Sequence, residues 1–111
     1  MPNQSRLDRV FQGLADPTRR AVLQRLAVGP APVSELAQPF KMALPSFSQH
    51  LAVLENCGLV KSRKAGRVRT YRLVPRSLDV ATHWLDGQRA VWETRLDRLD
   101  TYLTESKEHP S

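Results

Sequence analysis

The chain has 111 residues and only one cysteine, Cys57, and this scarcity excludes several kinds of chemistry. One thiol cannot form a disulfide within the chain, and it cannot supply a cysteine-pair metal or redox site. Cys57 ends an apolar helical pattern, which is typical of a small buried hydrophobic side chain. The alternative is a reactive thiol, or half of a site shared between two subunits.

The chain also lacks any apolar run of about 18 residues, so we expect no membrane-spanning helix. Its first residues carry no apolar signal region, and we therefore expect a cytoplasmic protein. Glycine-rich phosphate loops, nucleophile elbows and metal triads are missing as well. Ser48 and His50 stand two residues apart on a predicted helix and face different ways. The sequence thus predicts neither an enzyme nor a bound cofactor.

Positive charge, in contrast, is abundant and unevenly distributed. Residues 1–75 hold 12 Lys and Arg against 4 Asp and Glu, whereas residues 76–111 hold 5 against 7. A merely basic surface would spread its charge more evenly along the chain. Concentrating the net charge of +6 in one part of the chain favours a polyanionic partner.

The middle of the chain has the pattern of two short helices followed by a basic hairpin. We place a helix-turn-helix at residues 34–58 and a two-stranded hairpin at 59–73, with Gly66 in its turn. The apolar stripe that predicts the buried face of the second helix is Leu44, Phe47, Leu51 and Leu54. This layout is a winged helix-turn-helix, and it makes double-stranded DNA the leading partner.

Further helical patterns flank this unit on both sides. The sequence therefore predicts a mainly α (α+β) fold with about five helices, as a single domain over residues 1–104. A frayed tail is predicted at 105–111. The last helix, predicted over 76–104, carries apolar positions that step by three or four residues. A seam that long exceeds what one small domain needs to cover itself. It therefore favours packing against a partner helix.

The second helix of the pair offers short polar side chains of the kind that read base edges in the major groove. Gln49 can bond adenine through both amide atoms, Ser46 and Ser48 can bond bases or phosphates, and His50 can donate to a phosphate. Such a row is more often a solvated helix face. Here the row favours contact with DNA because it lies between a turn and a basic hairpin.

The hairpin holds six cations within the twelve residues 61–72. Two or three would be enough to protect an exposed strand edge, so we favour contact with the DNA backbone and, at the tip residue Arg67, with the minor groove. Lys41, in the turn, is a further phosphate candidate. Arg19 and Arg20 could reach phosphate, or could pair structurally with Asp16 or Asp8.

These residues resemble the ArsR family of small dimeric winged-helix repressors. The matching segments are Gly13–Arg20, Val33–Ala37, Phe47–Leu54 and Gly58–Val60. The resemblance spans roughly residues 6–104, and the combined motifs are specific. One departure is Ala43, which stands where many members carry a serine that caps the recognition helix.

The resemblance implies a dimer held by the first and last helices and a palindromic operator, usually released by an effector. The implied dimer-interface residues are Leu7, Val10, Phe11, Leu85, Trp92, Leu96, Leu99 and Leu103. It also assigns DNA contact to the polar row of the recognition helix and to Arg67 and Arg69 of the wing. With the other cations, the DNA-binding candidates are Lys41, Ser46, Ser48, Gln49, His50, Arg63, Lys64, Arg67 and Arg69.

Many members of that family sense metals, and two such sites can be weighed. A paired-thiolate site would need cysteines at 35–38, where there are none. Asp79 and His83 share a helix face, but Glu93 or Asp97 would have to complete their site, and His109 lies in the predicted tail. We therefore read Asp79 and His83 as a surface hydrogen bond and predict no metal.

The sequence as a whole predicts a homodimeric, sequence-specific DNA-binding regulator, a repressor that acts by steric exclusion at a palindromic operator. Its effector is unknown. Two alternatives stay open at this point. One is a winged-helix module that binds an acidic protein, and the other is a metal-responsive sensor of the same family.

Overall fold

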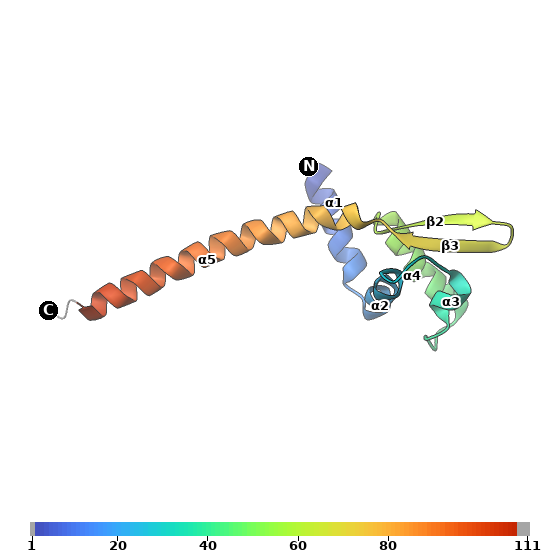
Figure 1. Ribbon diagram of the computed structural model, residues 1–111, viewed down its shortest axis with the longest axis horizontal. Coiled ribbons are helices and arrows are strands. Elements are labelled where there is room, and N and C mark those ends of the chain that lie inside the picture. The colour runs from blue at the N-terminus through green and yellow to red at the C-terminus, as the bar shows by residue number, and fades with distance from the viewer. Residues whose placement is uncertain (1, 109–111) are drawn as a thin grey trace. The chain divides into compact units, whose positions relative to one another are not determined.

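The structure is a computed structural model in which residues 2–108 are described. Its elements, shown in Figure 1, are α1 (Pro2–Leu14), α2 (Pro17–Leu26), β1 (Ala31–Pro32), α3 (Val33–Ala37), α4 (Leu44–Asn56), β2 (Val60–Ala65), β3 (Val68–Leu73), the 3-10 turn η1 (Pro75–Leu78) and α5 (Asp79–Glu108). This mainly helical winged helix-turn-helix confirms the predicted fold class, with α3 and α4 as the helix pair.

The wing differs from the prediction in having a third strand. The strand order is β1-β3-β2, and both pairings are antiparallel. Ala31 pairs with Tyr71, and Pro32 with Thr70. Proline is tolerated at this edge because an edge strand does not need every backbone N–H for the ladder. The short β1 fixes the start of α3 against the wing.

The core lies beneath α4 and beside the base of the wing. Phe47, Leu51 and Leu54 of α4 are at most 1% exposed, as their spacing predicts. Leu44 was predicted to join them, and this is wrong, because it is 59% exposed. It is the first residue of α4, where the chain has only just left the exposed turn.

Two arginines hold the C-terminal end of α1. Arg19 donates through Nε to the carbonyl of Gly13 at 3.0 Å and through Nη2 to that of Gln12 at 2.7 Å. Arg20 donates through Nη1 to the carbonyl of Leu14 at 2.7 Å. The last carbonyls of a helix have no partner within it, and cations there also complement its dipole. These bonds give both arginines a structural role, and Asp16, one of the predicted partners, accepts from the backbone N–H of Arg19.

Gly13 allows α1 to approach the base of the wing closely. A Cβ atom at this position would lie 2.6 Å from Cδ1 of Leu59, which is itself 2% exposed. The contact places the end of α1 directly against the residue that precedes β2. Any larger side chain at Gly13 would displace Leu59 from a packed site.

Contacts divide the chain into two compact units, one up to Ala81 and one from Thr82 onward, where the sequence predicted one domain over 1–104. Helix α5 is continuous and extends to Glu108, four residues into the segment that the sequence predicts to be a frayed tail. Residues 109–111, including His109, lie outside the described part. No helix in residues 2–108 combines the length and hydropathy that crossing a bilayer requires.

Candidate nucleic-acid interface

The polar row at the start of α4 faces away from the core. Ser46, Ser48 and Gln49 are exposed, while Phe47 between them is 1% exposed. The residue before the helix is Ala43, and no side chain caps the first turn. The N-terminal end of α4 therefore presents backbone N–H groups and a partial positive charge beside the polar row.

His50 is placed differently from the rest of that row. Its Nδ1 atom lies 3.2 Å from Nη1 of Arg19 and 3.7 Å from Oδ2 of Asp16, and its side chain is 23% exposed. The neutral ring can accept from the guanidinium at Nδ1, and the protonated ring would form an ion pair with the carboxylate, since 3.7 Å is beyond hydrogen-bond distance. In either protonation state, the partner of Nδ1 is a group of the protein itself. His50 thus links α4 to the start of α2, and that nitrogen is not available to a phosphate.

Asp16 completes this junction as the N-cap of α2, because its Oδ2 accepts from the backbone N–H of Arg19 at 3.1 Å. Partial burial raises the pKa of Asp16, but the Arg19 hydrogen bond and the nearby His50 outweigh this effect. The pKa of Asp16 consequently lies below its ordinary value of 3.8. The carboxylate stays ionised near neutral pH, which suits both the cap and the histidine contact.

Substituting Asp16 tests this assignment through pH. The folded-state pKa is lowered, so the stabilisation is complete above 3.8 and is lost as pH falls through the lower folded value. Asn caps a helix about as well as Asp but does not titrate. We expect Asp16→Asn to lose less of its thermal midpoint than the wild type on acidification to pH 3. Asp16→Ala should be less stable at every pH, and equal acid sensitivity of Asp16→Asn and the wild-type protein would contradict the assignment.

The wing carries its cations in like-charged cross-strand pairs. Lys61 lies opposite Arg72 on one face of the hairpin, and Lys64 lies opposite Arg69 on the other. All four are exposed, as are Arg63 and the tip residue Arg67. Like charges directly opposite each other destabilise a sheet. A bound polyanion would remove this repulsion.

Arg69 also belongs to a network that holds the wing to α4. Its Nη1 donates to Oγ of Ser62 at 2.8 Å, and that hydroxyl donates to Oε2 of Glu55 at 2.6 Å. The backbone N–H of Ser62 donates to the same carboxylate oxygen at 3.1 Å. Burial, and after it the negative charge of Glu55, raises the pKa of the adjacent Tyr71. Arg69 therefore positions the wing through Ser62.

Sequence reasoning did not identify this network, because Glu55 and Ser62 are separated by the turn between α4 and β2. It also left Lys61 and Arg72 out of the site, although both belong to the exposed cationic hairpin. Both residues alternate along their strands with wing residues that are buried, and this alternation was the sequence signal that could have added them to the site. Lys41, in the turn before α4, is exposed as expected.

The predicted dimer residues fall into two groups. In α1, Val10 is only 2% exposed and belongs to the core, so it is not available to a partner, whereas Leu7 and Phe11 are partly buried against that core. The residues predicted on α5 are exposed to between 49% and 60%, and they are Leu85, Trp92, Leu96, Leu99 and Leu103. Among the described residues, α5 thus carries a row of exposed apolar side chains.

Metal-ligating side chains do not gather in the described residues, where no group of three His, Cys, Asp or Glu could hold an ion. Asp79 and His83 both lie exposed on α5. Cys57 is partly buried and packs against the core, which agrees with the structural interpretation of this thiol.

The chain is similar to helix-turn-helix domains and to known transcriptional regulators. A family of helix-turn-helix domains matches residues 14–63. The HTH-type transcriptional regulator Rv2034 of Mycobacterium tuberculosis is 51% identical over 71 residues, which are 64% of this chain and 66% of that protein, just under two thirds of its length. The transcriptional repressor SdpR of Bacillus subtilis is 29% identical over 71% of this chain and 88% of its own.

Solved structures that resemble this chain are also transcriptional regulators or DNA-binding domains. The crystal structure of an ArsR family transcriptional regulator has a TM-score of 0.79 and 51% identity, covering 81% of this chain and 93% of that one. The solution structure of a homodimeric winged helix-turn-helix DNA-binding domain from Mycobacterium bovis has a TM-score of 0.62 and 30% identity, covering 86% and 85%. The fold is that of winged-helix transcription regulators. The chain belongs to the ArsR family of these regulators.

Proposed function

We propose that this protein is a homodimeric, sequence-specific repressor that binds a palindromic operator in double-stranded DNA. The observation that carries the proposal is the exposed polar row of α4. This row lies at the start of the helix, where the N-cap residue makes no side-chain hydrogen bond, and the cationic wing follows the helix in the chain. Side chains of this kind on a helix N-terminus reach base edges when the helix enters the major groove.

Within this proposal, Ser46, Ser48 and Gln49 contact bases or phosphates from α4. Lys41, Arg63 and Lys64 contact the phosphate backbone, and Arg67 at the wing tip enters the minor groove, where arginine is favoured. Lys61 and Arg72 extend this cationic surface. The repulsion between cross-strand cations supports the assignment, because it is a folding cost that binding to DNA would relieve.

The homodimer is supported by the exposed apolar stripe of α5 and by the homodimeric relative from Mycobacterium bovis. Two copies of α4 would then enter successive major grooves about 34–36 Å apart, and a two-fold protein would require a palindromic operator. Repression by steric exclusion of the polymerase would follow from occupying a promoter, and the relative SdpR is named a transcriptional repressor. A regulator that acts on genomic DNA works in the cytoplasm.

A mobility-shift assay with genomic footprinting tests the function. Three phosphate-contacting cations in each subunit, six per dimer, predict that log Kobs falls against log salt with a slope of about −5. The footprint should be two-fold symmetric, and a scrambled duplex should bind more weakly at every salt concentration. Absence of binding at low salt, together with a stable complex with an acidic protein on pull-down, would instead support a protein-interaction module.

A further inference from the structure

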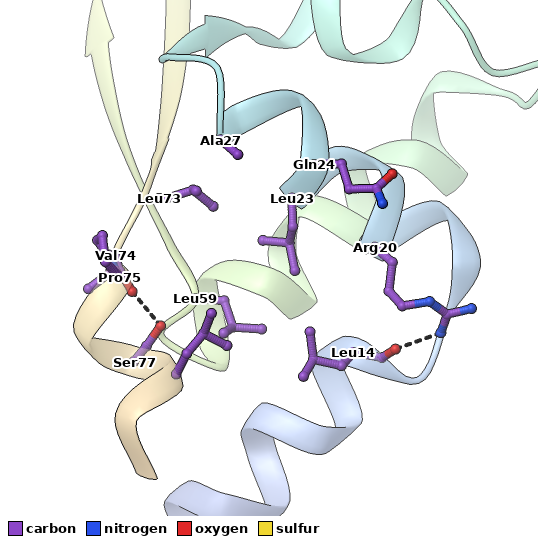
Figure 2. A pocket seen from close by; sticks show the side chains of 11 residues that line it. Leu14, Arg20, Leu23, Gln24, Ala27, Leu59, Leu73, Val74, Pro75 and Ser77 are labelled. Atoms are coloured by element: carbon purple, nitrogen blue, oxygen red, sulfur yellow. Dashed lines mark hydrogen bonds between the residues drawn. The ribbon is translucent and has the colours of Figure 1, made fainter. Parts of the chain in front are cut away.

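The first compact unit contains an apolar cavity of about 370 Å³ that the DNA interface does not use. Its walls come from the end of α1, one side of α2, the base of the wing and η1 (Figure 2). A volume of this size lies at the lower end of the range for small-molecule pockets, about 300–1,000 Å³.

The lining shows which ligand chemistry would fit. Of the eleven lining residues, eight are apolar, among them Leu14, Leu23, Leu59 and Leu73. Apolar walls hold water poorly, so an apolar ligand body would gain free energy by displacing it. The body of the ligand is therefore a hydrocarbon chain or a ring.

The polar lining residues are few, and only one is charged. Arg20 and Gln24 lie one helical turn apart on α2, side by side at one margin of the pocket (Figure 2). Arg20 is exposed, and its Nη1 donates to the carbonyl of Leu14, which is its one side-chain hydrogen bond within residues 2–108. The other N–H groups of the guanidinium remain for an anionic partner, and the planar fork matches a carboxylate.

We propose that this pocket binds a small amphipathic carboxylate, with its apolar body among the leucines and its carboxylate on Arg20. The proposed dimer stripe on α5 is made of other residues, from Leu85 to Leu103. A single cation beside an otherwise apolar cavity suits a small molecule with one anionic group better than a second protein surface.

The position of the pocket also gives the ligand a regulatory role. Leu59 precedes β2 and Leu73 ends β3, and the backbone N–H of Val74 donates to the carbonyl of Leu59 at 2.9 Å. A bound molecule would thus contact both ends of the wing where they meet. A ligand that binds one wing arrangement more tightly than the other changes DNA affinity by at most the ratio of its two affinities. This regulatory role rests on the proposed function, whereas ligand binding itself does not.

Calorimetric titration of the full-length protein with three matched probes tests the pocket directly. We expect decanoate to bind at least tenfold more tightly than decylammonium, with decan-1-ol between them. Arg20→Gln should weaken decanoate at least fivefold and decan-1-ol less than twofold. Because Arg20 also caps α1, Arg20→Lys, which keeps the charge, serves as a second variant, and thermal unfolding checks that each variant folds. Equal affinities for decanoate and decylammonium would overturn the proposal.

A blocking variant tests the location. Ala27 lines the pocket and is exposed, so Ala27→Trp should fill the cavity and weaken all three probes at least tenfold. Its matched control is Val28→Trp, because Val28 is 86% exposed and lies outside the lining. Unchanged probe binding by Ala27→Trp would refute this site. Loss of the dimer in Ala27→Trp, seen by sedimentation, would show that a second copy occupies the pocket instead.

The regulatory role is tested separately on the footprinted duplex. Decanoate should change the affinity of the wild-type protein for that duplex at least threefold and leave the affinity of Ala27→Trp unchanged. Probe binding without any change in duplex affinity would overturn the regulatory role. Probe binding by a protein that does not bind DNA would locate the failure in the proposed function.

Discussion

Leu96→Arg is expected to convert the dimer into monomers. Leu96 is 60% exposed in the single chain and lies on the same stripe of α5 as Trp92 and Leu99. A dimer would bury this stripe, and two symmetry-related arginines would then place like charges in its apolar centre at a large desolvation cost. We expect the dissociation constant of the dimer, measured by sedimentation equilibrium, to rise at least 100-fold, about 2.7 kcal/mol.

Thr94→Arg is the matched control for this prediction. Thr94 is exposed on α5 and lies roughly 160° around the helix from Leu96, at 3.6 residues per turn. The same side chain introduced there should leave the dimer intact. Operator affinity should fall in Leu96→Arg only, because each half-site would be bound independently. A dimer that tolerates Leu96→Arg would place the interface elsewhere.

Gln49→Ala and Arg67→Ala are expected to damage DNA binding in two different ways. Gln49 lies in the exposed polar row of α4, and its amide can bond adenine through two atoms. Its loss should cost about 1–3 kcal/mol on the operator, and far less on an operator already changed at that base pair. Arg67 is exposed at the wing tip beside Gly66, whose φ of 63° shapes the turn. Its loss should weaken all duplexes alike.

The measurement is a set of equilibrium affinities for the footprinted operator, its single base-pair variants and a scrambled duplex. Gln12→Ala is the control, because it removes the same amide from an exposed position of α1, outside the polar row. The affinity pattern of this variant should match that of the wild type. Equal losses on operator and scrambled DNA for both Gln49→Ala and Arg67→Ala would refute the roles assigned to them.

The wing and the recognition helix were predictable because their signals are local. Alternation along 68–73 puts Tyr71 and Arg72 on opposite faces of the hairpin, and in the structure Tyr71 is buried and Arg72 is exposed. The spacing of Phe47, Leu51 and Leu54 likewise defines the buried face of α4. A side-chain period depends only on backbone geometry, so it can be read without knowing what packs against the element.

The misjudged residues are those whose surroundings come from elsewhere in the chain. Val10 fits the apolar face of a first helix equally well as interface or as core, and only the packing of α1 shows that it is core. The third strand was missed because two residues with a proline carry no strand period. Its pairing depends on the presence of β3 beside it.

The amino-acid sequence by itself determined the class of this protein: a helix pair, a cationic hairpin and a long helix with an unpaired apolar stripe. The tertiary structure alone decided which polar side chains are available to DNA. Arg19 and His50 are 31 residues apart, yet their contact withdraws Nδ1 of the histidine from the recognition surface. Periodicity fixes which way a side chain points, but its hydrogen-bond partners are set by segments that only folding brings together.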